Sequence, residues 1–114
     1  MTDDSLDPEL IELANALLDA ARKGDAETVR AFLDHGAPAN LRDASGNTPL
    51  MLAAYHGHAA LVTELAARGA DVDLLNDRGQ SPLAGAAFKG FTEVATARYF
   101  ERAEIVELIE ARRA

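Results

Sequence analysis

Two histidines separated by a single glycine, His56 and His58, come nearest in this sequence to a metal-binding pattern. A metal site in a protein needs three or four nitrogen, oxygen or sulfur ligands that converge on one ion. His35 is the one remaining histidine, and the sequence has no cysteine. Gly57 is expected to end a helix, so the side chains on either side of it should diverge. We therefore predict that this pair binds no metal.

The acidic and hydroxyl side chains likewise form no recognisable catalytic set. Asp71 and Asp73 are close in sequence, but no further acids follow at the spacing of a calcium-binding loop. None of Ser5, Ser45 and Ser81 stands in a G-x-S-x-G nucleophile motif. The phosphate-binding patterns G-x-x-x-x-G-K-S/T and G-x-G-x-x-G do not occur. We therefore predict a protein that is not an enzyme and holds no cofactor.

Composition limits the partners and the compartment. The 114 residues carry a net charge of −8 and fit one domain, residues 1–114. This charge argues against nucleic acid and suits a partner with a basic surface, although solubility alone also explains it. The absence of cysteine fits a reducing compartment, and the acidic first ten residues lack the cationic region of a signal peptide. The longest apolar run, residues 50–55, is too short to cross a membrane. We expect a cytoplasmic protein that has no membrane contact.

Residues 47–79 form the clearest structural unit. Thr48 is suited to cap a helix, and Pro49 is tolerated as its first residue. Apolar residues then recur at helical spacing up to Gly57, and again in a second run that stops at Gly69. A polar stretch rich in turn-forming residues completes the unit. Two short helices and a loop cannot bury their own apolar faces, so the unit needs neighbours on both sides.

The sequence supplies these neighbours at a regular period. Residues 14–46 and 47–79 share ten identical positions. The Pro-Leu pair at 49–50 recurs at 82–83, and alanine pairs recur at 20–21, 53–54 and 86–87. Glycines keep the same period, at positions 24, 57 and 90, at 36 and 69, and at 46 and 79. Internal periodicity of this length indicates a repeat protein.

The segments TPLMLAAYHGH, LVTEL and RGADVD within residues 47–79 resemble the ankyrin repeat, whose period and T-P-L-H-x-A signature they match. The resemblance implies an all-α solenoid of stacked helix-turn-helix units with short hairpin-like fingers, about three repeats including caps. It implies a structural role for His58 and a loop-stabilising role for Asp71. The sequence departs from the family at Met51 and Ala84, where a histidine usually links adjacent repeats by hydrogen bonds. The Ala- and Arg-rich, cysteine-free composition indicates a bacterial source.

We divide the chain by this register. Residues 7–46 are predicted to form an N-terminal capping repeat, whose first helix starts at Pro8 and presents an apolar stripe through Leu10, Leu13 and Leu17. Residues 47–79 are the complete repeat. Residues 80–96 begin a third one.

The register fails after Thr96. Residues 97–112 align with residues 53–68 at an offset of 44 rather than 66, with six identities in 16 positions. Either a 22-residue deletion lies between Thr96 and Ala97, or the sequence joins two segments across a stretch that it leaves out. The alternative is one continuous helix over about residues 92–111. In each case residues 97–114 are predicted to serve as a C-terminal capping segment. If residues are deleted or left out after Thr96, this segment is the second part of a fourth repeat.

A binding surface is the function that remains. In ankyrin repeats the fingers and first helices line a concave face that binds folded protein partners. Tyr55 and Phe88 occupy equivalent positions in successive repeats, so we expect them to stand side by side on this face, either as binding anchors or as a shield over the seam between repeats. Carried over by position, the face comprises Arg42, Ser45, Asn47, Tyr55, His56, Asp77, Arg78, Gln80, Phe88 and Lys89. The alternative function is self-association through the irregular C-terminal repeat, although we favour a monomer over a homo-oligomer.

Overall fold

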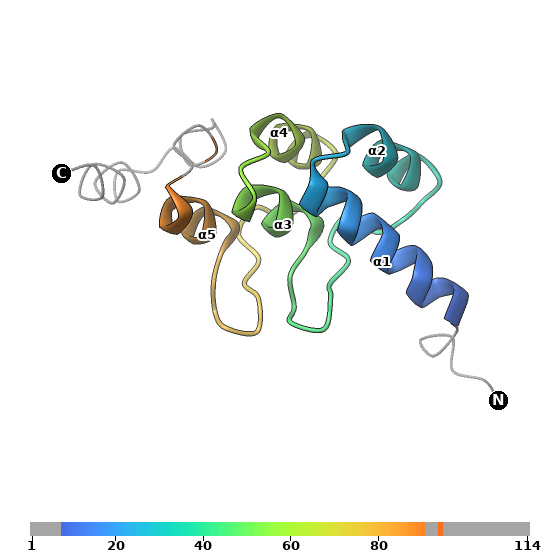
Figure 1. The fold of residues 1–114 in the computed structure, drawn as a ribbon, viewed down its shortest axis with the longest axis horizontal. Coiled ribbons are helices and arrows are strands. Elements are labelled where there is room, and N and C mark those ends of the chain that lie inside the picture. Colours follow the sequence, from blue (N-terminus) through green and yellow to red (C-terminus); the bar gives the residue numbers. More distant parts are fainter. Residues whose placement is uncertain (1–7, 91–93, 95–114) are drawn as a thin grey trace.

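The computed structural model describes residues 8–90 and residue 94, and within them it is all-helical (Figure 1). The helices are α1 (Pro8–Lys23), α2 (Ala26–Asp34), α3 (Pro49–Tyr55), α4 (Ala59–Ala67) and α5 (Pro82–Lys89). No strand occurs in this described part, which confirms the predicted all-α class. Two predictions lie outside the described residues: the junction between Thr96 and Ala97, and the capping segment at residues 97–114 with its alternative, a continuous helix over about residues 92–111.

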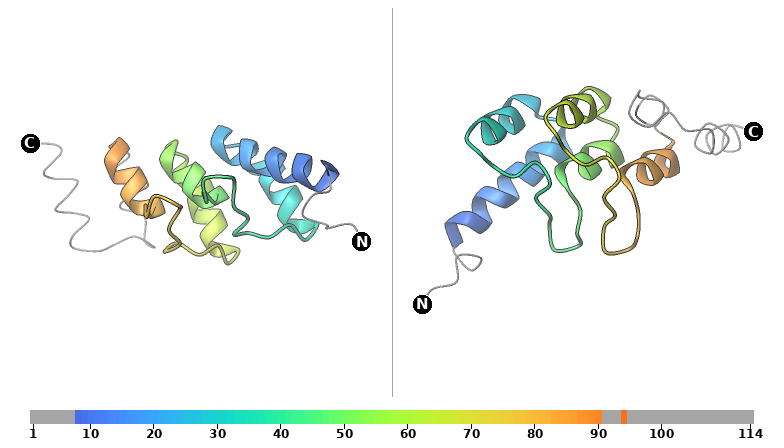
Figure 2. Two further views of the ribbon diagram at one scale, coloured as in Figure 1. Left: turned by 90° about the horizontal axis from the view of Figure 1, so that it is seen from below. Right: turned by 180° about the vertical axis from the view of Figure 1, so that it is seen from behind.

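The helices form two rows with loops along one edge (Figures 1 and 2). Helices α1, α3 and α5 make the first row, and α2 and α4 make the second. Helix α3 contacts α1 on one side, α5 on the other, and α4 behind it. Two loops, residues 35–48 and 68–81, extend from the same edge, and we call them the first and second fingers. The first helix of the unit at residues 47–79 therefore has a neighbour on each side in the described stack.

Local signals set the helix boundaries. The Thr48 hydroxyl accepts a hydrogen bond from the Met51 amide (3.2 Å), and the Ser81 hydroxyl accepts one from the Ala84 amide (3.0 Å). Each of these caps precedes a proline, which has no amide hydrogen to leave unsatisfied at the start of a helix. The seven glycines that recur at the repeat period all have positive φ angles, as expected for helix ends and tight turns.

Leucine and alanine have different roles in the core. Leu17, Leu50, Val62 and Leu65 are at most 1% exposed and fill the space between the rows. The alanine pairs that share one phase, at 20–21, 53–54 and 86–87, are also buried, at 5% exposure or less. Small side chains on α1, α3 and α5 let these helices approach closely. This pattern confirms the stacking that the alanine periodicity predicts.

The apolar stripe on α1 is about half exposed over its first two turns. Leu10 and Leu13 are 50% and 53% exposed, and full burial begins only at Leu17. Helix α1 has 16 residues whereas α3 has seven, so the start of α1 extends past its neighbour in the row (Figure 1). Among the described helices, none is long and apolar enough to span a bilayer.

Candidate interaction groove

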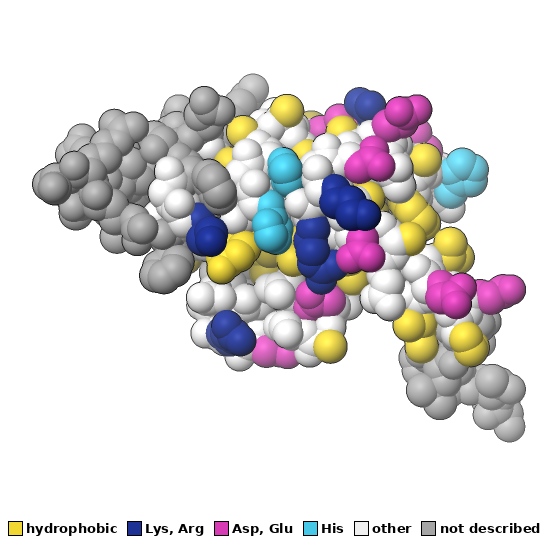
Figure 3. Space-filling view, in the orientation of Figure 1, with side chains coloured by type: hydrophobic (Ala, Val, Ile, Leu, Met, Phe, Trp, Pro, Cys, Tyr) yellow, Lys and Arg dark blue, Asp and Glu magenta, His cyan; other side chains and the backbone are white. Residues whose placement is uncertain are grey.

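A hollow of about 550 Å³ lies between the fingers and the first row of helices, and we call it the groove. It is lined by Arg22, Asp43, Ser45, Asn47, Met51, Leu52, Tyr55, His56, Asn76, Arg78, Gln80, Ser81, Pro82 and Gly85. Figure 3 shows the face of the molecule that carries the first row, with histidines and Lys or Arg side chains across its middle and several Asp or Glu side chains beside them. Six of the ten residues predicted for the binding face line the groove: Ser45, Asn47, Tyr55, His56, Arg78 and Gln80.

The other four predicted residues have different surroundings. Lys89 stands at the edge of the groove, with its Nζ 5.1 Å from the centre of the Tyr55 ring. Arg42 and Asp77 link the two fingers: Arg42 donates to the Leu75 carbonyl (3.1 Å), and the Asp77 amide donates to the Ser45 carbonyl (3.0 Å). The backbone of Phe88 lies in α5, but its side chain is outside the described part of the structure. The predicted pairing of Tyr55 with Phe88 therefore stays a prediction.

Two equivalent side chains hold the fingers in shape. Asp43 accepts hydrogen bonds from the amides of Ser45 and Asn47, both at 2.9 Å. Asn76, the equivalent residue of the second finger, accepts from the amides of Arg78 (2.9 Å) and Gln80 (3.0 Å). Neither Asp43 nor Asn76 was predicted from the sequence as a groove residue. The repeat spacing was the signal that could have paired them.

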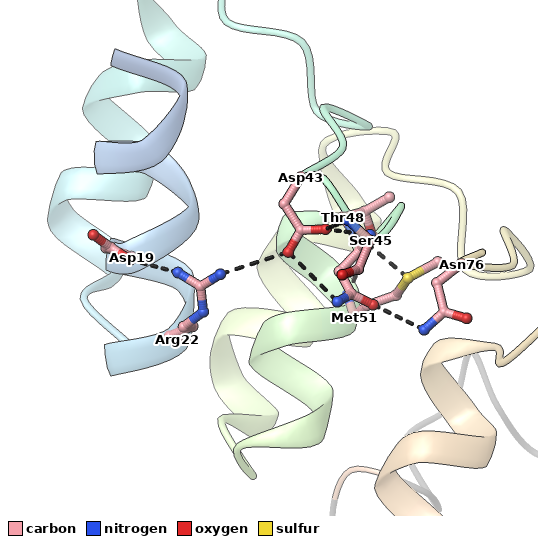
Figure 4. A network of polar contacts seen from close by, with 8 residues as sticks. Asp19, Arg22, Asp43, Ser45, Thr48, Met51 and Asn76 are labelled. Atoms are coloured by element: carbon pink, nitrogen blue, oxygen red, sulfur yellow. Dashed lines mark hydrogen bonds and ion pairs between the residues drawn. The ribbon is translucent and has the colours of Figure 1, made fainter. Parts of the chain in front are cut away.

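The fingers are also tied to each other. Asn76 donates its side-chain N–H to the Asn47 side-chain oxygen (2.9 Å), as Figure 4 shows. A Cβ on Gly46 would lie 2.9 Å from the backbone nitrogen of Asp77, so only glycine permits this close approach of the two loops. Bonds within and between the fingers thus fix one wall of the groove before any partner arrives.

Met51 replaces the histidine that the family usually places here. Its side chain is 5% exposed, and its sulfur accepts a hydrogen bond from the Thr48 amide at 3.4 Å (Figure 4). A thioether is a weak acceptor with no hydrogen to donate. Met51 therefore supports the start of α3, while the finger contacts described above connect the repeats.

The charged side chains of the groove are mostly basic. The Arg22 guanidinium lies between Asp19 and Asp43, and its distance to the Asp43 carboxylate is 3.5 Å (Figure 4). Asp43 is the one carboxylate among the described residues that line the groove. In the second row, by contrast, arginines meet carboxylates across the repeats, in Arg30–Glu64 (3.2 Å) and Arg68–Asp34 (2.7 Å).

His56 and His58 do diverge. The His56 ring meets the Tyr55 ring edge-on at 5.4 Å and lines the groove. Burial lowers the pKa of His56, and electrostatic interactions with His58, Arg22 and Lys89 lower this pKa further. His58 turns toward α1, where its Nε2 lies 2.7 Å from the Arg22 carbonyl oxygen. His58 thus bonds one repeat to the next, in agreement with the structural role that the family resemblance implies. The described residues contain no group of three or more His, Cys, Asp or Glu side chains that could hold a metal ion.

Comparison with known proteins agrees with the observed repeats. A family profile described as ankyrin repeats (3 copies) matches residues 17–99. A protein of Pseudomonas aeruginosa, whose name assigns it to the ankyrin repeat proteins, is 50% identical over 50 residues. These residues make up 44% of this chain and 29% of that protein, so the match spans under a third of the relative's length. The relative is bacterial, which supports the bacterial source that the composition indicates.

Proposed function

The chain belongs to the ankyrin repeat family, and we propose that it docks a folded protein partner in the groove without doing chemistry on it. Ankyrin repeats generally mediate interactions between proteins, and members of the family are typically not enzymes. The identity of the binding face is our proposal. We place the protein in the cytoplasm, because a cysteine-free sequence suits a reducing compartment.

The main support for this proposal is an exposed aromatic ring in a groove whose wall is held in place by hydrogen bonds within and between the fingers. Tyr55 is 41% exposed although it is the last residue of α3, the middle helix of the first row, and lies beside Gly85 of α5. Aromatic and arginine side chains near the centre of an interface usually supply most of the binding energy. The finger bonds hold the surrounding wall in place, so binding loses little conformational entropy. Tyr55, with Arg78 across the groove, is therefore the proposed anchor.

Affinity capture from the native lysate, followed by mass spectrometry, tests this proposal. We expect Tyr55→Ala to lose a partner that the unchanged protein recovers, because truncation removes the anchor. Ile11→Ala is the matched control, since Ile11 is similarly exposed (46%) but lies on α1 outside the groove. Thermal unfolding would establish that both variants are folded. Full recovery of the same partner by folded Tyr55→Ala would refute the groove as the docking face.

Self-association is the second candidate, and one observation favours it. The first turns of α1 leave the neighbouring Leu10 and Leu13 about half exposed, and exposed apolar side chains that form a contiguous patch often mark contact sites. This location differs from the C-terminal repeat considered from the sequence, which lies outside the described residues. Light scattering on a sizing column distinguishes the candidates. A mass of one chain at every concentration would eliminate self-association.

A further inference from the structure

The floor of the groove has a gap where the repeat register would place a side chain. Leu52 lines the groove and is 6% exposed. The equivalent position in the next repeat is Gly85, which also lines the groove. A Cβ built on Gly85 meets one side chain, that of Tyr55, at an ordinary contact distance of 3.5 Å. The packing therefore does not require glycine at this position.

The backbone does not require this glycine either. Gly85 lies inside α5, and its φ angle is not positive. The glycines that end helices or form turns, by contrast, all have positive φ angles. Glycine inside a helix is normally less favourable than alanine. What Gly85 provides is open space beside the Tyr55 ring, with Leu52 and Pro82 also on the lining. This space suits one apolar side chain of a ligand.

The charges around that space are positive. Asp43 already binds two backbone amides and the Arg22 guanidinium, so its carboxylate is occupied within the protein. In the part of the chain that the structure describes, neither Arg78 nor Lys89 forms an ion pair with a carboxylate. Lys89 lies over the Tyr55 ring at one side, and Arg78 lines the groove from the second finger. The groove thus has the opposite sign to the net charge of −8.

We propose that the groove binds an extended acidic segment of a protein partner, with one apolar side chain over Gly85 and carboxylates that pair with Lys89 and Arg78. The net charge suggests a basic partner surface, but local complementarity decides which groups meet in a contact. The inference rests on the proposed function, because it assigns a ligand chemistry to the same groove.

Selection from a random heptapeptide display library on the full-length protein tests the ligand chemistry. The expected result is enrichment of peptides in which Asp or Glu flanks one apolar residue. The best peptide should bind more weakly at high than at low salt, roughly 500 mM against 50 mM NaCl, because salt screens exposed charges. Enrichment of neutral or basic peptides would overturn the inference.

Three variants then locate the binding site of the selected peptide. Gly85→Leu restores the leucine of the preceding repeat and fills the gap, and we expect at least a tenfold loss of affinity. Arg78→Gln and Lys89→Gln should each weaken binding roughly two- to fivefold, as for exposed ion pairs. Lys23→Gln is the charge-matched control, since Lys23 lies on α1 and does not line the groove.

The outcomes separate this inference from the function on which it rests. Neutral or basic peptides that lose binding in Gly85→Leu would overturn the acidic ligand while leaving the groove as the docking face. Acidic peptides that bind Gly85→Leu, Arg78→Gln and Lys89→Gln as tightly as the unchanged protein would overturn both, because their site would lie elsewhere. Acidic peptides that respond to Gly85→Leu, Arg78→Gln and Lys89→Gln, but not to Lys23→Gln, would support both.

Discussion

His58 shows how a single side chain connects two repeats. Its ring bonds to the Arg22 carbonyl and leaves no room for a side chain on Gly24. A Cβ on Gly24 would lie 2.5 Å from the nearest ring atom of His58. Gly24 is therefore constrained twice, by its positive φ of 74° and by this contact.

Gly36 provides the comparison that separates the two constraints. It has a similar φ of 93°, but a Cβ there would meet nothing within 4 Å. We expect Gly36→Ala to cost about 1–2 kcal/mol in the free energy of unfolding, the usual penalty for a left-handed residue that bears a Cβ. Gly24→Ala should cost clearly more, because His58 must also move. Urea unfolding measures both values, and equal losses would show that the His58 contact is unimportant.

The pKa of His56 depends on the charge of the groove. Its pKa lies below the ordinary value of 6.5, chiefly because of burial and then because of nearby positive charges, including Lys89. Removing that charge with Lys89→Gln should raise the His56 pKa, whereas Lys23→Gln should leave it unchanged. An NMR titration of the imidazole protons measures both effects. An unaltered His56 pKa in Lys89→Gln would contradict a groove field to which Lys89 contributes.

The lowered pKa also predicts how stability depends on pH. A histidine whose folded-state pKa lies below its unfolded value favours the unfolded chain once that chain takes up the proton. The contribution of His56 is therefore intact above about pH 6.5 and is lost as the pH falls from there toward the folded-state pKa.

At the scale of elements, α3 holds the stack together. It contacts α1, α4 and α5, and its Leu50 side chain is completely buried. The ion pairs between α2 and α4 lie at the surface, with the Asp34 side chain 62% exposed, and such pairs add little stability. Apolar packing on both sides of α3 must therefore supply most of the cohesion between repeats.

Truncation inside α3 tests that conclusion. We expect Leu50→Ala to lower the free energy of unfolding by about 2–5 kcal/mol, because it removes buried contacts and leaves a cavity. Leu75→Ala is the matched control, since Leu75 is 51% exposed in the second finger and should change stability little. Denaturant unfolding followed by circular dichroism supplies both values. A loss below about 1 kcal/mol for Leu50→Ala would contradict the stacking of repeats around α3.

Helices were predictable because their signals are local. Thr48 and Ser81 cap the expected helices, and the periodic glycines adopt the expected turn conformations. The exposure of Leu10 was not predictable, because a stripe of leucines does not reveal whether a neighbouring helix is long enough to cover it. Periodicity identifies an apolar face, whereas its burial depends on what packs against it.

The outline of the groove was predictable from the repeat register, but the bonding of its loops was not. The repeat register places Ser45, Asn47 and Tyr55 on one surface, and the structure brings these three together. The bonding roles of Asp43 and Asn76 depend on loop geometry, which sequence spacing does not specify. The basic character of the groove was missed because it depends on which carboxylates are already engaged within the protein.

At the scale of the whole molecule, the two rows of helices have different surfaces. The second row carries ion pairs between repeats, whereas the first row and the fingers line the groove with a partly exposed tyrosine and basic side chains. Of these basic side chains, Arg78 in the second finger and Lys89 on α5 lack carboxylate partners among the described residues. A partner that docks in the groove should therefore cover the fingers, α3 and α5. The outer surface of α2 and α4 should remain open to water.

Hydrogen–deuterium exchange on the captured complex tests this central claim most directly. Amides that already exchange too slowly to measure in the free protein cannot show further protection. The comparison therefore uses amides that exchange measurably without the partner. We predict slower exchange on binding in the fingers, around residues 43–47 and 76–80, and at the ends of α3 and α5. We predict no change in α2 or α4. Protection confined to α2 and α4, with the fingers unaffected, would contradict the groove as the docking surface.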